Sequence, residues 1–216
     1  MSTRTDPALQ QALDALAPCI SIGHRLIAPG DEAALTDDEA RSIATTVLAV
    51  RRASGSARLV VRDLLARLGH PGCAVLKTAS GAPAWPAGIV GSLAHDDQVA
   101  VAAVARRGDV AALGIDVEPA EPLPDDVLDL VATEPERPGL AGDPIAGRLL
   151  FVAKEAVYKA VYPLDGVILD FHDITVDLAG REAVVHNGRV LDLRICRVPR
   201  LVVLALARPD PRESSP

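Results

Sequence analysis

The stretch FVAKEAVYKAVYP, residues 151–163, carries the strongest structural signal in this sequence. At helical spacing it is apolar on nearly every side, because Val, Ala and Phe recur on all faces. Such a helix is normally buried, yet this one contains Lys154, Glu155 and Lys159. A buried charge must be paired, bound to a metal or used in chemistry, so each of these residues needs one of those explanations.

Length and composition predict a globular protein with one large domain or two domains of about 100 residues. The 216 residues are 49% hydrophobic but only 2% aromatic, so the core must consist mainly of Ala, Val and Leu. No apolar run reaches the roughly 18 residues that span a membrane, and the first residues, MSTRTDPALQQALD, have no signal-peptide core. We therefore expect a cytoplasmic protein without a membrane partner.

Charge and cysteine spacing narrow the function classes further. A net charge of −7 argues against general nucleic-acid binding, although residues 51–67 contain a basic cluster of Arg51, Arg52, Arg58, Arg62 and Arg67. The three cysteines show no CxxC pair and no zinc-binding pattern. We expect reduced, buried side chains at Cys19, Cys73 and Cys196.

The first half of the chain combines helices with short strands. Helices are predicted over residues 8–17 and 36–52, the second opening with Thr36 and Glu39 in a capping-box pattern. SGS at 54–56 is expected to interrupt the helical pattern before a further helix that stops at Gly69. Apolar runs rich in Ala and Val then predict strands at 73–78, 99–105 and 112–118.

The second half repeats this combination after a Pro-rich, acidic stretch. A helix is predicted at 146–161, followed by strands at 173–178, 182–186, 189–195 and 201–207. The pattern indicates an α+β fold of two similar, pseudo-duplicated halves, each with helices packed on a small antiparallel sheet. The expected divisions are an N-terminal half at 1–118, a central loop at 119–145, a C-terminal half at 146–207 and a disordered tail at 208–216.

Carboxylates in two separate motifs suggest a metal site. In LGIDVEP, residues 113–119, side-chain alternation on a strand directs Asp116 and Glu118 to the same side. Alone, this pattern more often marks the solvated face of an edge strand. Glu155 would add a third carboxylate, and three such groups repel unless a cation such as Mg²⁺ neutralises them. The alternative for Glu155 is an exposed ion pair with Lys159.

Several polar residues of the first half suggest phosphate binding. Ser92 and His95 lie in GSLAH, residues 91–95, where each could donate to a phosphate oxygen. Arg58 and Arg62 are four residues apart on one helix face, and guanidinium groups match phosphate oxygens. A structural histidine and a solvated basic face are the alternatives.

Taken in order, WPAGIVGSLAH (85–95), LGIDVEP (113–119) and FVAKEAVYKA (151–160) resemble the three motifs of the 4′-phosphopantetheinyl transferases. The resemblance is to the large monomeric branch of nonribosomal peptide, polyketide and siderophore pathways, and within it to actinobacterial members. It extends over most of the chain and implies two similar α+β halves. It also implies Mg²⁺-dependent transfer of phosphopantetheine from coenzyme A (CoA) to a serine of an apo carrier protein, with release of 3′,5′-ADP.

The resemblance assigns roles residue by residue. Asp116, Glu118 and Glu155 would hold Mg²⁺, and Glu155 would also be the candidate general base. Lys159 would stabilise charge on the pyrophosphate. Arg62 and His95 match family CoA-binding positions, and Arg58 aligns with a basic residue common in this branch. The residues predicted to bind CoA are therefore Arg58, Arg62, Ser92, His95, Lys154 and Lys159.

Two further readings stay open at this point. The chain is either an active transferase, a catalytically degenerate module that binds CoA or a carrier, or a Mg²⁺-dependent phosphohydrolase of CoA or nucleotides. For a transferase, we expect the carrier to dock on the central loop through the apolar residues Leu123, Val127, Leu128 and Leu130.

Overall fold

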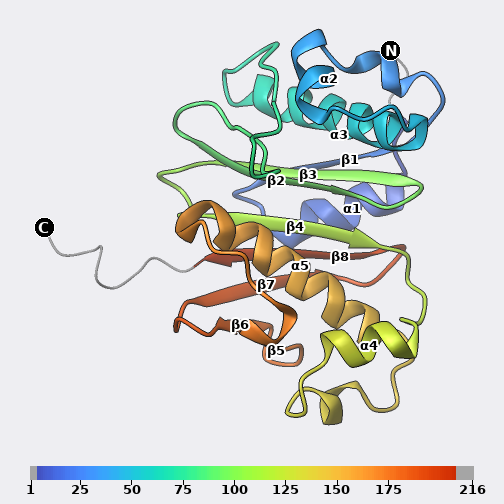
Figure 1. Ribbon diagram of the computed structural model, residues 1–216, viewed down its shortest axis with the longest axis vertical. Helices are drawn as coiled ribbons and strands as arrows, with labels where there is room; N and C mark the ends of the chain where they lie inside the picture. The colour runs from blue at the N-terminus through green and yellow to red at the C-terminus, as the bar shows by residue number, and fades with distance from the viewer. Residues whose placement is uncertain (1–3, 208–216) are drawn as a thin grey trace, which may run out of the picture. The chain divides into compact units, whose positions relative to one another are not determined.

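In a computed structural model of the chain we describe residues 4–207, which belong to two compact units, Met1–Asp109 and Val110–Pro216 (Figure 1). Each unit has one antiparallel sheet with a long helix on it, which confirms the predicted α+β class and the two similar halves. No helix among the described residues is long and apolar enough to cross a membrane.

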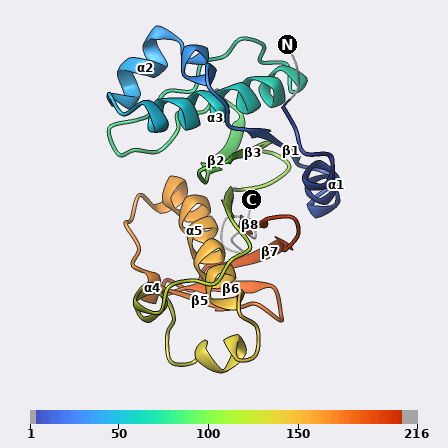
Figure 2. The same ribbon diagram turned by 90° about the vertical axis from the view of Figure 1, so that its right-hand side faces the viewer.

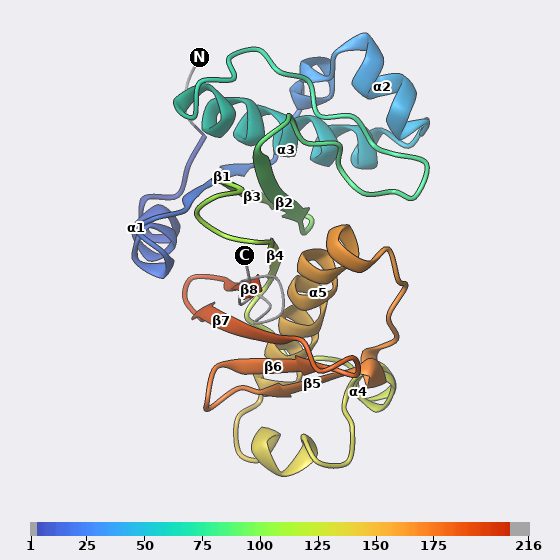
Figure 3. The same ribbon diagram turned by 90° about the vertical axis from the view of Figure 1, so that its left-hand side faces the viewer.

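The first unit is a three-stranded sheet covered by one long helix (Figure 2). The strands β1 (Ser21–Leu26), β2 (Ile89–His95) and β3 (Val99–Arg106) lie in the order β1-β3-β2. The helix α3 (Leu48–Arg67) packs Val60, Leu64 and Leu65 against Ala102 and Val104 of β3. Two shorter helices, α1 (Pro7–Leu16) and α2 (Asp37–Ile43), complete the unit, and α1 lies beside β1 (Figure 3).

The second unit is a five-stranded sheet in the order β4-β8-β7-β6-β5. Its strands are β4 (Leu113–Glu118), β5 (Ile174–Asp177), β6 (Glu182–Val185), β7 (Val190–Cys196) and β8 (Leu201–Ala207). The helix α5 (Ala146–Asp165) packs on this sheet, and α4 (Asp125–Val131) lies between β4 and α5 in the sequence.

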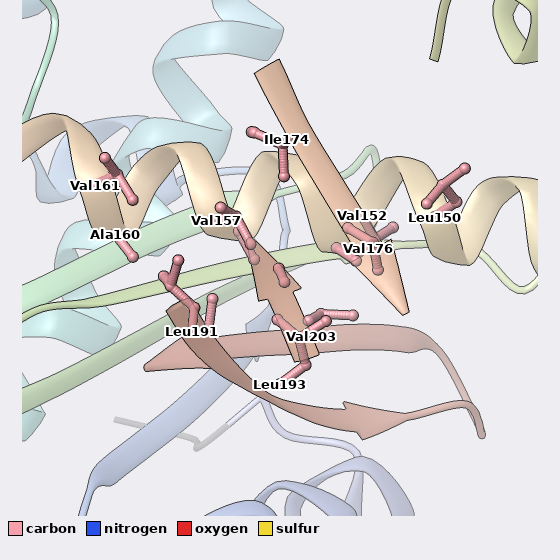
Figure 4. Packing of buried hydrophobic residues seen from close by; sticks show 14 of the residues in the cluster. Leu150, Val152, Val157, Ala160, Val161, Ile174, Val176, Leu191, Leu193 and Val203 are labelled. Carbon is pink, nitrogen blue, oxygen red and sulfur yellow. The ribbon is translucent and has the colours of Figure 1, made fainter. Parts of the chain in front are cut away.

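The core of the second unit confirms that the FVAKEAVYKAVYP stretch is a buried helix. Val152, Val157 and Ala160 of α5 are fully buried and pack with Leu191 and Val203 of the sheet (Figure 4). Branched aliphatic side chains and alanines make up nearly all of this cluster, as the low aromatic content predicts. Packing of this apolar face supplies most of the stability of such a helix.

The helices of the first unit differ from the prediction at two points. The capping box at Thr36 and Glu39 is confirmed, but α2 ends at Ile43 and the next helix begins at Leu48. SGS does not interrupt α3. Gly55 lies instead at a close contact, where a Cβ atom would collide with the Asp31 backbone. The small residues therefore mark a close helix contact, since Ser56 Oγ also donates to Asp31 at 2.6 Å.

Residues 73–78 do not form the predicted strand. Two backbone N–H groups of this segment donate to side chains instead of to a neighbouring strand. Val75 N donates to Glu39 at 3.0 Å, and Lys77 N donates to Ser42 at 3.0 Å. Only an isolated bridge from Lys77 to Pro83 remains. GSLAH, for which no strand was predicted, is part of β2, and its Gly91 leaves room for the Trp85 ring.

The predicted boundary at residue 118 and the cysteine prediction also need correction. β4 pairs with β8 from Leu113↔Leu206 to Glu118↔Leu201, so the GIDVE motif belongs to the second unit, which starts at Val110. All three cysteines are free, but only Cys196 is buried, whereas Cys19 is exposed. The predicted disordered tail, 208–216, lies outside the described residues.

Candidate active site

A glycine sets the distance between the two elements that carry the predicted metal ligands. A Cβ atom at Gly114 of β4 would overlap Ala156 O of α5 and lie 2.6 Å from Ala160 N. Only glycine lets the strand approach the helix this closely. The contact places the DVE carboxylates of β4 beside the charged residues of α5.

Asp116 and Lys159 form the shortest ion pair of this region. Lys159 Nζ donates to Asp116 Oδ1 at 2.6 Å, between a carboxylate that is 9% exposed and an ammonium that is 29% exposed. Lys159 therefore reaches across to β4 rather than pairing only with Glu155 along its own helix. The exposed i,i+4 alternative is not what the structure shows for this lysine.

Glu118 is held by an arginine that the sequence analysis did not single out. Arg148 of α5 donates from one terminal nitrogen to Glu118 Oε2 at 2.7 Å. A usable signal was present, because Arg148 precedes Glu155 by seven residues and therefore shares its helix face. The glycine of LGIDVEP was a second overlooked signal, since glycine inside a strand often marks a close backbone approach.

Glu155 is electrostatically coupled to both strand carboxylates. Burial raises the pKa of Glu155 above its ordinary value; the Lys159 charge opposes this rise, and Asp116 and Glu118 add to it. The side chain borders a cavity of about 240 Å³ together with Tyr158, Leu169 and Phe171. Glu155 of α5 therefore lies within electrostatic range of both carboxylates of β4, and Lys159 of the same helix contacts Asp116 directly.

The donor set of Asp116, Glu118 and Glu155 fits a hard divalent cation in its chemistry. Carboxylate oxygens are the ligands that Mg²⁺ prefers, and mutual repulsion of three carboxylates favours a bound cation. In the present arrangement Lys159 and Arg148 balance the negative charges of Asp116 and Glu118. Within residues 4–207, no three acidic, His or Cys side chains are gathered tightly enough to hold a metal ion.

Lys154 has a different partner from the one predicted. It is fully buried, and its Nζ donates to Glu136 at 2.7 Å and to two backbone carbonyls, Val131 O at 2.8 Å and Phe171 O at 2.9 Å. All three donors of its ammonium group are thus used inside the protein. The prediction that Lys154 contacts CoA is therefore corrected, because the residue is a structural anchor.

The two predicted arginines of the first unit are also engaged by protein atoms. Arg62 donates to both oxygens of Glu39, at 2.8 and 3.1 Å, and to Ala34 O at 2.6 Å. Arg58 is 5% exposed and donates to Val75 O at 3.4 Å. Burial lowers the pKa of Arg58; Glu39 opposes this effect and Arg62 adds to it. The two guanidinium groups and Glu39 thus form one cluster, in which Arg58 and Glu39 are buried and Arg62 is partly exposed.

Ser92 and His95 do not point the same way. Both belong to β2, but they are three residues apart, so their side chains leave opposite faces of the strand. Ser92 is buried, whereas His95 is exposed at the strand end. The structure therefore separates the two groups that the sequence analysis took together.

Models of one enzyme family match both units of the chain. Residues 38–105 match the 4′-phosphopantetheinyl transferase N-terminal domain, and residues 112–203 match the 4′-phosphopantetheinyl transferase superfamily. The boundary between the two matches falls where the two structural units meet in the sequence. The chain belongs to the 4′-phosphopantetheinyl transferase family.

Three relatives from actinobacteria support this assignment. The 4′-phosphopantetheinyl transferase Npt of Nocardia iowensis is 44% identical over 155 residues, 69% of this chain and 70% of that protein. Svp of Streptomyces mobaraensis is 45% identical over 68% of this chain, and PptT of Mycobacterium tuberculosis 41% over 63%. The chain spans 62% of the length of each of these last two transferases.

Proposed function

We propose that this protein transfers 4′-phosphopantetheine from CoA to a serine of an apo carrier protein and releases 3′,5′-ADP. Family membership and the printed names of the three relatives support this reaction. The structural observation that carries it is the close approach of β4 to α5 at Gly114, where Lys159 pairs with Asp116 and Arg148 pairs with Glu118. The proposed carriers are acyl or peptidyl carriers of polyketide, nonribosomal peptide or siderophore synthesis, and the proposed state is a monomer.

Mg²⁺ is the proposed cofactor, with Asp116, Glu118 and Glu155 as its protein ligands. When bound, the ion would supply positive charge to the pyrophosphate of CoA. Lys159 adds a second positive group on the same side. Its ammonium stabilises charge on the phosphate oxygens, because a positioned cation lowers the barrier to phosphoryl transfer.

Glu155 is the proposed general base. It accepts the proton of the serine hydroxyl as the serine oxygen attacks the phosphorus that carries pantetheine. The bond from that phosphorus to the bridging oxygen breaks, and the bridging oxygen leaves with 3′,5′-ADP. A carboxylate in a desolvated position is a stronger base than an exposed one, which favours this role near neutral pH.

The remaining predicted CoA contacts are Arg58, Arg62, Ser92 and His95. For Arg62, a phosphate contact would have to add to the bonds with Glu39 and Ala34, so we expect its replacement to affect stability as well as CoA binding. His95 is the more accessible of the two β2 residues.

Two leucines of the central loop, Leu128 and Leu130, differ in their exposure. Leu128 packs partly against the core of the second unit, and a side chain at Gly147 would lie 3.0 Å from it. Leu130 is 66% exposed. We therefore propose Leu130 as the main apolar contact for the carrier.

Incubation with CoA and Mg²⁺, with and without an apo-carrier, tests the proposal. Intact-mass measurement should show one phosphopantetheine added to the carrier and 3′,5′-ADP in solution. Breakdown of CoA without any carrier would instead indicate a phosphohydrolase. Binding of CoA without transfer to any member of a carrier panel would indicate a degenerate binding module.

A further inference from the structure

Arg148 makes an unusual set of contacts for a residue at the start of a helix. Each of its three guanidinium nitrogens donates to a different acceptor: Glu118 Oε2 at 2.7 Å, Glu121 O at 3.1 Å and Pro122 O at 3.0 Å. Its side chain is only 16% exposed and that of Glu118 only 23%. The guanidinium therefore joins the last residue of β4 to the segment that follows it.

Only arginine can make this set of contacts from one position. The guanidinium is planar and carries its donors in a fixed fork, so three acceptors around it are fixed relative to one another. A lysine ammonium carries all its donors on one nitrogen and would have to abandon at least one of these acceptors. The contacts thus restrict both the Glu118 carboxylate and the backbone at residues 121–122.

The position of Arg148 on α5 connects it to the candidate active site. It lies two helical turns before Glu155, and Lys159 follows Glu155 by one turn, so these side chains share one face. Arg148 pairs with Glu118 and Lys159 pairs with Asp116. Each strand carboxylate therefore has its own cation from α5.

We propose that Arg148 is a positioning residue, which holds the Glu118 carboxylate in place for metal binding and ties it to the segment after β4. This inference rests on the proposed function, because it takes Glu118 as a metal ligand. Groups that hydrogen-bond to ligating carboxylates typically change metal affinity by 10- to 100-fold when they are removed.

Two effects of Arg148 on a bound divalent cation oppose each other. Its positive charge repels the cation, so removing the charge alone would strengthen binding. Its hydrogen bonds orient a ligand, so removing them weakens binding. The proposal requires the second effect to be the larger, and this gives the experiment a definite sign.

Direct binding of Mn²⁺, followed by electron paramagnetic resonance of the free ion, provides the test. We expect Arg148→Met to lower Mn²⁺ affinity about 10-fold and Arg148→Lys to lower it by a smaller factor. The matched control is Arg194→Met, which removes the same charge from an exposed position on β7 of the same unit. This control should leave the affinity unchanged.

Unchanged or tighter Mn²⁺ binding by a folded Arg148→Met variant would overturn the inference. Should that variant fail to fold, Arg148→Lys decides alone, and wild-type affinity in it has the same meaning. A second readout is hydrogen exchange of the peptide at 118–125, which should become faster in both Arg148 variants and not in the control.

The transfer assay on the unaltered protein separates this inference from the proposed function. Transfer together with unchanged Mn²⁺ binding in the Arg148 variants would leave the function standing and remove Arg148 from it. Failure of the unaltered protein to bind Mn²⁺ would overturn the role of Arg148, whereas failure to modify any carrier would count against the function itself.

Discussion

The two units anchor their long helices through the same kind of turn, in which a threonine N–H donates to a buried glutamate. In the first unit Thr36 N donates to Glu39 at 3.0 Å, and in the second Thr133 N donates to Glu136 at 2.8 Å. Both are Thr-x-x-Glu turns, and both glutamates are buried. Each also accepts a backbone N–H from an extended segment further along the chain, that of Val75 or that of Val176.

The long helices supply matching partners to these turns. Arg62 of α3 pairs with Glu39, and Lys154 of α5 pairs with Glu136. Seven residues before each cation stands a glycine at a close contact, Gly55 in α3 and Gly147 in α5. The pseudo-duplication is therefore visible in one shared set of contacts, although the sequence shows no clear repeat.

Arg62 in α3 and Lys154 in α5 each anchor their helix to a buried glutamate. The two units differ at the residue that follows each of these anchors. Asp63, which follows Arg62, is exposed, whereas Glu155, which follows Lys154, is partly buried and coupled to Asp116 and Glu118. The comparison explains why two predicted CoA contacts, Arg62 and Lys154, both have carboxylate partners within the protein. It also predicts that replacing Arg62 or Lys154 lowers the free energy of unfolding, whereas replacing Glu155 lowers the rate of transfer.

The largest effect is expected at the fully buried anchor. Lys154→Met leaves the Glu136 carboxylate buried without a counter-charge, which costs about 3–5 kcal/mol of the free energy of unfolding. In the intact protein the pKa of Glu136 lies below its ordinary value, because hydrogen bonds led by that of Lys154 outweigh the effect of burial. Urea unfolding of the variant and the unaltered protein measures the loss.

Its counterpart in the first unit sharpens the comparison. Arg62→Met should cost less, because the Arg62 side chain is 19% exposed and its removal admits water to Glu39, whereas Lys154 is fully buried. The double variant Lys154→Met with Glu136→Gln should recover part of the loss. A larger loss for Arg62→Met would show that the two anchors are not ranked by burial.

The second effect concerns turnover rather than stability. Glu155→Gln keeps the size of the side chain but removes its charge and basicity, so kcat should fall at least about 100-fold, or about 2.7 kcal/mol in the barrier. The variant should still bind CoA. Phosphopantetheine transfer measured by intact mass gives the rate.

Asp63→Asn is the matched control for this variant. Asp63 follows the anchor of α3 as Glu155 follows the anchor of α5, but it is exposed, so transfer should be unaffected. Near-normal turnover in Glu155→Gln would rule out a base at this position. Glu155, like Asp63 in the first unit, would then have no role in the transfer reaction.

A third, smaller effect is expected just before the second Thr-x-x-Glu turn. The residue Leu130 is 66% exposed there, and a buried leucine contributes roughly 1.5–3 kcal/mol. Leu130→Asp should therefore weaken carrier binding about tenfold, or about 1.4 kcal/mol, and leave CoA binding intact. Val184→Asp, at an exposed position of β6, is the control. Equal losses in both variants would speak against a carrier contact at Leu130.

The sequence correctly predicted those elements that depend on residues close together in the chain. Thr36 and Glu39 form the predicted capping box, and the apolar pattern of α5 correctly predicted a buried helix. These features depend on neighbours in the chain, which is why the sequence displays them.

The remaining features depend on partners far away in the sequence. SGS was predicted to break a helix, because nothing near Gly55 reveals that Asp31 packs against it. Lys154 was assigned to CoA, because its partner Glu136 lies 18 residues away in a Pro-rich stretch. β4 was assigned to the first half, because strand pairing with β8 has no local signature.

The smallest effect is expected at a histidine of the first unit and is specific to pH. His24 of β1 is 4% exposed; its Nε2 accepts from Asp6 N at 2.8 Å, and its Nδ1 lies 3.0 Å from Gln10 Oε1. Since Nε2 must be unprotonated to accept, Nδ1 carries the hydrogen and donates to Gln10. The neutral ring therefore ties the start of α1 to the sheet.

Protonation of His24 should weaken this tie, and the direction of the pKa shift sets the pH range. Burial lowers the pKa of His24 below 6.5, against the opposing charges of Asp6 and Asp14. The unfolded chain thus takes up this proton at a higher pH than the folded one, so the free energy of unfolding falls as pH drops below about 6.5. Carboxylates with lowered pKa lose their contribution only at more acidic pH. Urea unfolding at pH 7.5 and pH 5.5 should show the difference, and His24→Gln should reduce it. A difference that persists unchanged in His24→Gln would place the pH-sensitive contact elsewhere.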